Sequence, residues 1–214
     1  TLPRKSISLG DVIGQGNFGK VYAGTAKDPQ RGGSKIAVAI KSPSPTARLE
    51  FEAEMEIMGQ LTRLGGHPHI VGVVGCVYGN RPLLVLEFCP GGSLKAALTA
   101  VRTFKADGGD GGAGAPRSVA RFGNAGLATC GHQVALAMAF LEHHSLLHRD
   151  LAARNVLLAA DQQMCKLCDF GLSRVMDRVT QAMTMQIGTP AFMAPELMTG
   201  NASVTSTAPS SHTY

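Results

Sequence analysis

Charged residues are scarce in this sequence of 214 residues, since Asp, Glu, Lys and Arg make up only 16% of it, against about 25% in an average soluble domain. Long apolar runs are also absent. The longest, at residues 70–78 and 134–141, fall well short of the roughly 18 residues that span a bilayer. Because apolar residues still make up 44% of the chain, we expect a folded protein of one domain or two small lobes, with no membrane segment.

Runs of basic residues are missing too, although Lys and Arg outnumber Asp and Glu by 20 to 15. A nucleic-acid partner usually requires clustered positive charge, so we expect no nucleic-acid binding. The five cysteines are odd in number and too sparse for a disulfide framework, which favours the reducing cytoplasm. Cys165 and Cys168 form a C-x-x-C pair, but no second pair and no suitably spaced histidine accompany it. We interpret both as strand residues rather than as a zinc or redox site.

Short segments rich in β-branched residues, which glycines separate, occupy the first part of the chain. We predict five antiparallel strands, at residues 8–13, 19–26, 35–41, 70–78 and 82–88. Residues 47–64, between the third strand and the fourth, carry apolar side chains at helical spacing with glutamates between them, which predicts one amphipathic helix. The expected fold class is therefore α+β, with a five-stranded antiparallel sheet and one helix in the first lobe.

The second part of the chain is predicted to be mainly helical. Ser93 is a suitable N-cap for a helix from residue 94 to about 103, and residues 127–144 form a strongly apolar helix. Between them, residues 107–116 contain five glycines and a proline, a composition that predicts a mobile insert. Two short strands are expected further along, around Asn155 and before Asp169.

A glycine-rich segment, Gly-Gln-Gly-Asn-Phe-Gly, occupies residues 14–19. Dinucleotide-binding folds use the same spacing, but there the glycines open a helix and an acidic residue follows about 20 positions later. Here Val21 continues a strand, and Lys41 follows instead of an acid. Such a hairpin can lay its backbone N–H groups over phosphates, and Lys41 can supply a positive charge to them. The alternative is an ordinary hairpin turn and a surface lysine.

Polar residues are concentrated between two apolar segments at residues 148–155, His-Arg-Asp-Leu-Ala-Ala-Arg-Asn. Asp150 and Asn155 can face one site from such a loop, where the carboxylate accepts a proton from a hydroxyl and the amide binds a metal. Asp169 follows a short apolar strand, so its carboxylate can bind a hard cation such as Mg²⁺. Taken alone, Asp-Phe-Gly at residues 169–171 is an ordinary turn.

Five motifs, GQGNFGKV, VAIK, HRDLAARN, DFG and APE, follow one another in this order between residues 14 and 196. With them the chain resembles a eukaryotic protein kinase domain. The segments EFEAEMEIM, HPHIVGVVGC and KLCDFGLSR are similar to those of receptor tyrosine kinases. The resemblance implies a bilobal protein kinase fold, ATP and Mg²⁺ as cofactors, and transfer of the γ-phosphate to a hydroxyl group of a protein substrate.

Roles for individual residues follow from this resemblance. It implies a lysine, Lys41, that holds the α- and β-phosphates and pairs with Glu54, four positions before Met58 as in the family's E-x-x-x-M. It places the metal on Asn155 and Asp169. The implied catalytic residues are Asp150, Lys41, Glu54 and Arg154.

The implied nucleotide site combines the glycine-rich loop, an apolar sandwich for adenine, a gatekeeper and a hinge. Its residues are Gly14, Gln15, Gly16, Asn17, Phe18, Gly19, Val21, Ala39, Lys41, Leu86, Glu87, Cys89 and Leu157. Leu86 is the gatekeeper, and residues 87–89 form the hinge. His148 matches a packed apolar spine together with Met58 and Phe170, so we interpret it as a core residue rather than as an acid or base.

The sequence gives conflicting indications of which residue type accepts the phosphate. Ala152 stands where serine/threonine kinases usually have a lysine, and Arg154 lies near the acceptor, which favours tyrosine. Thr189 stands where tyrosine kinases normally have a proline, which favours serine or threonine. We favour a tyrosine kinase, with a tyrosine-kinase-like serine/threonine kinase as the alternative.

The segment between Asp169 and Glu196 resembles an activation loop, and it contains no tyrosine. Arg149 is positioned, by the resemblance, to bind a phosphate on this loop. The hydroxyl groups that could carry such a phosphate belong to Ser173, Thr180, Thr184 and Thr189.

We expect an N-lobe at residues 1–89, a partial C-lobe at 90–200 with an insert at about 104–126, and an unstructured tail at 201–214. The tail contains no acidic residue and no apolar helix, unlike the corresponding region of the family. The C-lobe is therefore expected to be truncated, and an inactive nucleotide-binding scaffold is a further alternative. The resemblance implies a cytoplasmic enzyme or the intracellular portion of a membrane receptor, which would form a dimer.

Overall fold

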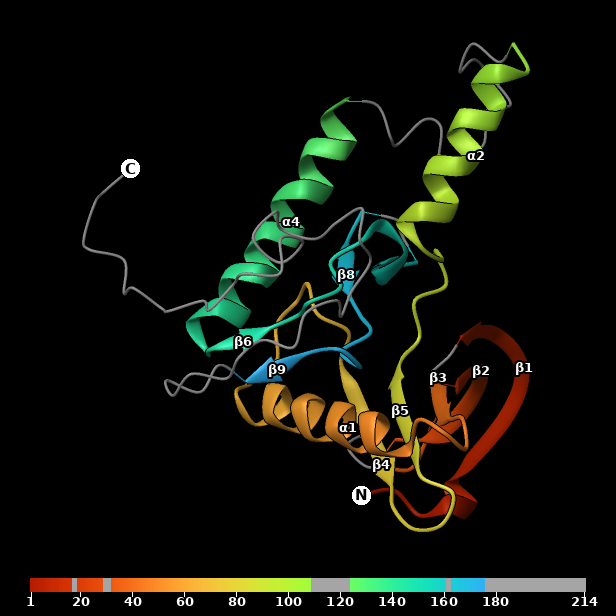
Figure 1. Cartoon of the computed structure of the whole chain (residues 1–214). Coiled ribbons are helices and arrows are strands. Elements are labelled where there is room, and N and C mark those ends of the chain that lie inside the picture. Colours follow the sequence, from red (N-terminus) through yellow and green to blue (C-terminus); the bar gives the residue numbers. More distant parts are fainter. Residues whose placement is uncertain (17–18, 29–31, 109–123, 161–162, 176–214) are drawn as a thin grey trace, which may run out of the picture.

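The computed structural model describes residues 1–16, 19–28, 32–108, 124–160 and 163–175. A β-sheet and one helix, α1, lie at one end of the molecule, and two helices, α2 and α4, lie at the other (Figure 1). Short strands connect the two ends.

The larger sheet has five strands, and every neighbouring pair is antiparallel, as the sequence predicted. Their order across the sheet is β1-β2-β3-β5-β4. The strands are β1 (Ile7–Gly16), β2 (Gly19–Lys27), β3 (Lys35–Pro43), β4 (Val73–Val77) and β5 (Leu83–Glu87), and a short 3₁₀ helix, η1 (Arg4–Ser6), precedes them.

One predicted strand begins later than expected. Residues 70–78 were predicted as a strand, whereas β4 begins at Val73. Ile70 instead forms a parallel bridge to Leu167, and the amide of Val71 donates to the Leu167 carbonyl at 2.9 Å. These apolar residues therefore pair with another part of the chain before the sheet begins.

Helix α1 (Arg48–Arg63) coincides with the predicted amphipathic helix. Most of its buried apolar residues recur at intervals of three and four, which places them on one face of the helix. They are Phe51, Met55, Ile57, Met58 and Leu61. Glu54 is also buried, although it is charged, and it is paired with Lys41 on β3.

Side chains on one face of the sheet form a buried apolar cluster. Val38 and Ile40 on β3 are fully buried in a cluster with Leu2 and Val85. Leu2 precedes the sheet and lies against Gly75 of β4, where an added Cβ atom would be 2.5 Å from the leucine side chain. Its amide donates to the Cys76 carbonyl at 2.8 Å, so the first residues cover the β4 edge.

Among the described residues, the second part of the chain contains the helices α2 (Leu94–Ala106) and α4 (Asn124–His143). The hydroxyl of Ser93 accepts a hydrogen bond from the amide of Ala96 at 3.2 Å, which confirms the predicted N-cap of α2. Both helices extend into the expected insert at 104–126, from either end. Most of that insert, residues 109–123, and the expected tail at 201–214 lie outside the described residues.

Two small antiparallel pairs complete the fold. They are β6 (Leu146–Leu147) with β9 (Arg174–Val175), and β7 (Val156–Leu158) with β8 (Cys165–Leu167); a 3₁₀ turn, η3 (Ala153–Asn155), precedes β7. One apolar cluster runs from α1 through β7 and β8 to α4, and it includes Met58, Leu158, Leu141 and Phe170. The sheet end and the helical end therefore share one core.

All five cysteines carry free thiols. Cys165 is buried on β8, as the strand interpretation requires, and Cys168 lies just beyond the end of that strand. Burial raises the pKa of both Cys89 and Cys168, to about 11 for Cys89. Within the described ranges, no helix combines the length and the apolar character that crossing a bilayer requires.

Candidate active site

Lys41 joins three elements of the fold. Its Nζ atom lies 2.7 Å from the Glu54 Oε1 atom on α1 and 2.9 Å from the Asp169 Oδ1 atom in the loop after β8. Lys41 and Glu54 are almost completely buried, whereas the Asp169 side chain is 39% exposed. The structure thus brings together three residues that are 13 and 128 positions apart.

The charges of this cluster do not balance when all three groups are ionised, because one ammonium group faces two carboxylates. Burial alone would lower the pKa of Lys41, but Glu54 and Asp169 outweigh it and raise that pKa. Burial raises the pKa of Glu54, and Lys41 opposes this shift only in part. The excess negative charge beside the exposed Asp169 favours an additional cation at this point.

Asp150 has its carboxylate held by two neighbours on the same loop. The Arg154 Nη2 atom donates to both carboxylate oxygens at 2.6 Å, and the Asn155 Nδ2 atom donates to Oδ2 at 2.8 Å. The Asp150 side chain is 11% exposed and that of Arg154 is 40% exposed. Sequence reasoning missed this ion pair, although the four-residue spacing of an acid and a base was its signal.

His148 connects the two loops that carry Asp150 and Asp169. Its Nδ1 atom accepts from the Asp150 amide at 3.3 Å, and its Nε2 atom donates to the Cys168 carbonyl at 3.0 Å. These two bonds require the neutral imidazole. The side chain is buried and meets the Phe170 ring edge-on at 4.9 Å, and burial lowers its pKa. The expectation of a packed core histidine is confirmed.

The two residues expected to hold a metal lie on adjacent loops. The Cys168 amide donates to the Asn155 carbonyl at 2.9 Å, so the residue before Asp169 lies against Asn155. The amide nitrogen of Asn155 is engaged with Asp150, which leaves its amide oxygen for a metal. A carboxylate and an amide oxygen suit Mg²⁺. In the described part of the chain no cluster of three or more His, Cys, Asp or Glu residues can hold a metal. Mg²⁺ bound here would take its other ligands from water or phosphate oxygens.

The glycine-rich hairpin lies on β1 and β2. Gly14, Gln15 and Gly16 lie on β1 and Gly19 begins β2, while residues 17–18, Asn17 and Phe18, lie outside the described residues. Gly19 has φ +142°, and a Cβ atom there would be 2.0 Å from the Ser42 carbonyl oxygen. Only glycine fits this approach of β2 to β3.

One face of the sheet collects the residues expected around adenine. Val21 lies opposite Lys41 in the strand register, and Ala39 lies opposite Leu86. Because directly opposed residues share a face and Ala39 is two positions from Lys41, all four lie on the same side. Val21, Ala39 and Leu86 are half-buried, which is the burial expected of residues that border an open cleft.

The hinge residues and Leu157 lie where the sheet end meets the helical end. Leu157 on β7 bridges to Ser93, just after the hinge, and Cys89 is buried. The Glu87 amide donates to the Gly72 carbonyl at 2.9 Å, and its carboxylate accepts from Lys166 at 2.9 Å. The Glu87 amide and carboxylate are therefore both engaged within the protein.

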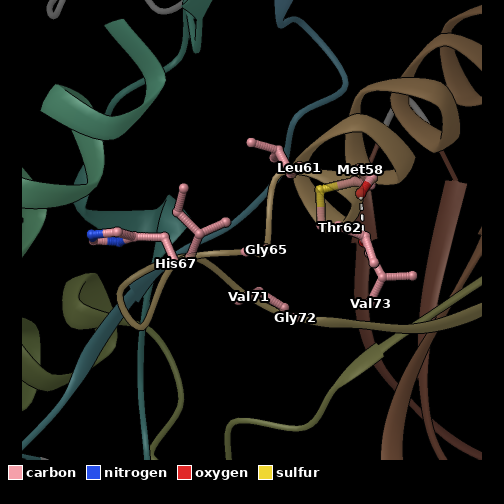
Figure 2. A pocket seen from close by; sticks show the side chains of 10 residues that line it. Met58, Leu61, Thr62, Gly65, His67, Val71, Gly72 and Val73 are labelled. Carbon is pink, nitrogen blue, oxygen red and sulfur yellow. Dashed lines mark hydrogen bonds between the residues drawn. The ribbon is translucent and has the colours of Figure 1, made fainter. Parts of the chain in front are cut away.

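A cavity of about 200 Å³ lies behind the C-terminal end of α1 and is lined by residues from α1 and from the segment that leads into β4. Figure 2 shows Met58, Leu61 and Thr62 on its helix side and Val71 to Val73 along its other side. None of the residues expected to bind the nucleotide lines it. This cavity is therefore distinct from the predicted site.

The expectations for the activation loop are only partly tested. Thr180, Thr184 and Thr189 lie outside the described residues. The prediction that the Ser173 hydroxyl could carry a phosphate is wrong. Ser173 is only 1% exposed, and its hydroxyl donates to the His148 carbonyl at 3.1 Å. Arg149 has φ +65°, and burial, together with the nearby Arg174, lowers its pKa.

Comparisons with known proteins agree with this geometry. The family profile described as protein tyrosine and serine/threonine kinase matches residues 7–208. The chain is 32% identical to fibroblast growth factor receptor 1 of Dugesia japonica, over 92% of this chain and 22% of that protein. It is 35% identical to human ephrin type-A receptor 1, over 78% of this chain and 15% of that protein.

A relative of another kind is similarly close. Mitogen-activated protein kinase kinase kinase 2 of Arabidopsis thaliana is 34% identical, over 88% of this chain and 27% of that protein. The chain thus spans less than a third of the length of each of these relatives.

Proposed function

Since this chain belongs to the protein tyrosine and serine/threonine kinase family, we propose that it transfers the γ-phosphate of ATP to a protein hydroxyl, with tyrosine as the favoured acceptor. The observation that carries this proposal is the convergence of Lys41, Glu54 and Asp169 through contacts of 2.6–2.9 Å. Asp150 and Asn155 lie on the neighbouring loop. Hydrogen bonds of His148 and Cys168 join that loop to the segment that carries Asp169.

Lys41 holds the phosphates of the nucleotide in this proposal. Glu54 fixes the ammonium group, because the buried ion pair leaves the lysine few other positions. Two unit charges 4 Å apart attract by about 4 kcal/mol at an effective dielectric of 20. Withdrawal of α1, which carries Glu54, would therefore release Lys41 and reduce activity.

Asp150 accepts the proton of the substrate hydroxyl. Arg154 and Asn155 orient its carboxylate, because both donate hydrogen bonds to it. Asn155 and Asp169 would hold Mg²⁺, which, when bound, neutralises charge on the phosphate oxygens. Gly14, Gly16 and Gly19 allow the hairpin backbone to approach those oxygens.

Arg154 supports tyrosine as the acceptor. Its side chain is 40% exposed beside the proposed catalytic carboxylate, where a planar cation can contact an incoming phenol ring. Serine or threonine is the second candidate, supported by Thr189 within Gly-Thr-Pro at residues 188–190 and by the plant kinase relative.

We place the protein in the cytoplasm, because five free thiols suit a reducing compartment. Two of the relatives are named as receptors. On that analogy, we further propose that this domain works as the intracellular portion of a receptor and pairs with a second copy.

A transfer assay tests the proposed reaction. The chain is incubated with Mg²⁺-ATP and either a copolymer of glutamate and tyrosine or a basic peptide whose only hydroxyl groups belong to serine and threonine. We expect phosphate transfer to the copolymer, and a 10²–10⁴-fold lower rate for Asp150→Asn because the variant lacks the proton acceptor. Transfer to the peptide alone would favour the second acceptor class.

The same assay separates an enzyme from an inactive scaffold. A scaffold would bind Mg²⁺-ATP, detected by calorimetry, without transferring phosphate to either acceptor. Equal transfer rates in the unmodified chain and in Asp150→Asn would refute the catalytic assignment of Asp150.

A further inference from the structure

We infer that Ser173 is a positioning residue for Asp150: its hydroxyl holds the carbonyl of His148 and thereby fixes the backbone on which the catalytic carboxylate lies. The inference rests on the proposed function in that Asp150 is taken as the proton acceptor. It replaces the expectation that Ser173 carries a phosphate.

Ser173 lies where the second strand of a small pair begins. Leu147 on β6 pairs with Arg174 on β9, so His148 and Ser173 are the next residues beyond the end of the ladder. No backbone pairing is assigned at this step, and the Ser173 Oγ atom instead donates to the His148 carbonyl at 3.1 Å. The side chain thus extends the pairing by one residue. At this point the catalytic loop, residues 148–155 with Asp150, follows β6.

The peptide after this carbonyl is in an unfavourable conformation. Arg149 has φ +65°, in the left-handed region that residues with a side chain rarely adopt. Two hydrogen bonds hold the flanking groups, from Ser173 to the His148 carbonyl and from the Asp150 amide to His148 Nδ1 at 3.3 Å. Both bonds are long for their donor types, and of the two only the bond from Ser173 holds the His148 carbonyl itself. Without it, the peptide between residues 148 and 149 can rotate, and Asp150 moves with it.

The same residue restrains the loop of Asp169, which also has φ +65°. The Ser173 amide donates to the Phe170 carbonyl at 3.0 Å and closes the turn that follows Asp169. Ser173 therefore ties the Asp169 loop to the catalytic loop through both its backbone and its side chain. Its burial, with 1% exposure, keeps water from replacing the hydroxyl.

Kinetics of Ser173→Ala test the inference. Alanine removes the hydroxyl and little volume, so we expect kcat for the glutamate–tyrosine copolymer to fall about 10-fold, the effect of losing one buried hydrogen bond. The KM for ATP should change less than about 2-fold, because alanine keeps the backbone bond to the Phe170 carbonyl that restrains the Asp169 loop. Ser6→Ala is the matched control, since that hydroxyl also donates to a backbone carbonyl, of Pro3 at 2.7 Å, but on the exposed surface. It should leave kcat within about 2-fold. An unchanged kcat in Ser173→Ala overturns the inference.

A double-mutant cycle distinguishes positioning from general weakening. If Ser173 acts through Asp150, adding Ser173→Ala to Asp150→Asn should lower the residual rate by less than about 2-fold. A full 10-fold further loss in that background overturns the inference, because the serine would then act independently of the carboxylate.

Hydrogen exchange gives a readout that does not depend on activity. In Ser173→Ala the amide of Asp150 should exchange at least about 10-fold faster, with the amides of β5 unchanged. Unchanged exchange at Asp150, or faster exchange throughout the molecule, overturns the inference. A chain that transfers no phosphate but shows the local change would refute the proposed function and leave the positioning role of Ser173 standing.

Discussion

Lys41 and Glu54 form an ion pair whose side chains are only 10% and 3% exposed. Removing one partner of such a pair leaves a charge buried without compensation. We therefore predict that Lys41→Met abolishes phosphate transfer and also lowers the free energy of unfolding, by about 3–5 kcal/mol. Urea denaturation measures the second effect.

The control for this prediction neutralises the more deeply buried of the two carboxylates that remain. Adding Glu54→Gln to Lys41→Met should recover part of the lost stability, because a neutral amide is less costly to bury than a carboxylate. A single variant as stable as the unmodified chain would show that the pair does not stabilise the fold.

His148 and His67 predict a dependence of stability on pH. Burial lowers the pKa of both, and for His67 the neighbouring His69 lowers it further. Below the unfolded value of about 6.5 the unfolded chain binds protons that the folded chain excludes. We therefore expect the free energy of unfolding to fall as the pH drops from 7.5 to 5.5, measured by urea denaturation at several pH values.

Substitutions test which histidines cause this dependence. His67→Gln should make the slope with pH shallower, because it removes one of the two groups. His132→Gln, at an exposed position on α4, should leave the slope unchanged. The same slope in all three proteins would argue against a contribution from His67.

At this scale the sequence predicted the candidate site residues but not their surroundings. Asp150, Asn155 and Asp169 could be proposed because their types and order within polar segments are unusual. Burial of Lys41 and the bond from Ser173 to His148 could not, because both depend on contacts between residues 13 and 25 positions apart. The short segment around Ser173 has no periodic spacing of apolar residues that would distinguish a buried hydroxyl from an exposed one.

Among the elements, α2 offers the clearest test. Its N-cap is Ser93, whose hydroxyl accepts from the Ala96 amide. We predict that Ser93→Ala lowers the free energy of unfolding by about 1 kcal/mol, as the loss of an N-cap usually does. Ser93→Asp should retain the stability, because a carboxylate caps the helix equally well. If the alanine and aspartate variants unfold at the same urea concentration, the cap does not stabilise α2.

Periodicity predicted α1 well, since its buried residues lie on one face, and short β-branched segments between glycines predicted the five strands of the sheet. The start of β4 was predicted poorly. Residues 70–72 are apolar because they pair with β8, and a run of apolar residues does not reveal its partner. The ends of α2 and α4 were also misjudged, because glycine-rich composition hid how far the helices extend.

For the whole molecule, the sheet end and the helical end share one apolar cluster, and the proposed nucleotide residues come from both. A ligand that contacts both ends should stabilise the folded chain as a unit. We predict that Mg²⁺-ATP at about 100 times its Kd adds about 2.7 kcal/mol of stability. Differential scanning calorimetry should detect a rise in Tm of roughly 5–10 °C.

Two comparisons make this thermal test specific. ATP with a chelator should shift Tm less than Mg²⁺-ATP, and Asp169→Asn should reduce the difference because it removes a proposed metal ligand. A shift that is independent of Mg²⁺ in both proteins would argue against Asp169 as a metal ligand.

The packing of Leu2 on Gly75 has a practical consequence when the N-terminal end of this chain is shortened. A recombinant version that started at Ile7 would lose the leucine and uncover the outer strand of the sheet, whose free backbone groups would then be available for pairing with another molecule. Such a version would precipitate more readily, even though its catalytic residues were untouched. A side chain larger than glycine at position 75 would be tolerated only in that shortened version, because Leu2 would no longer occupy the space beside it.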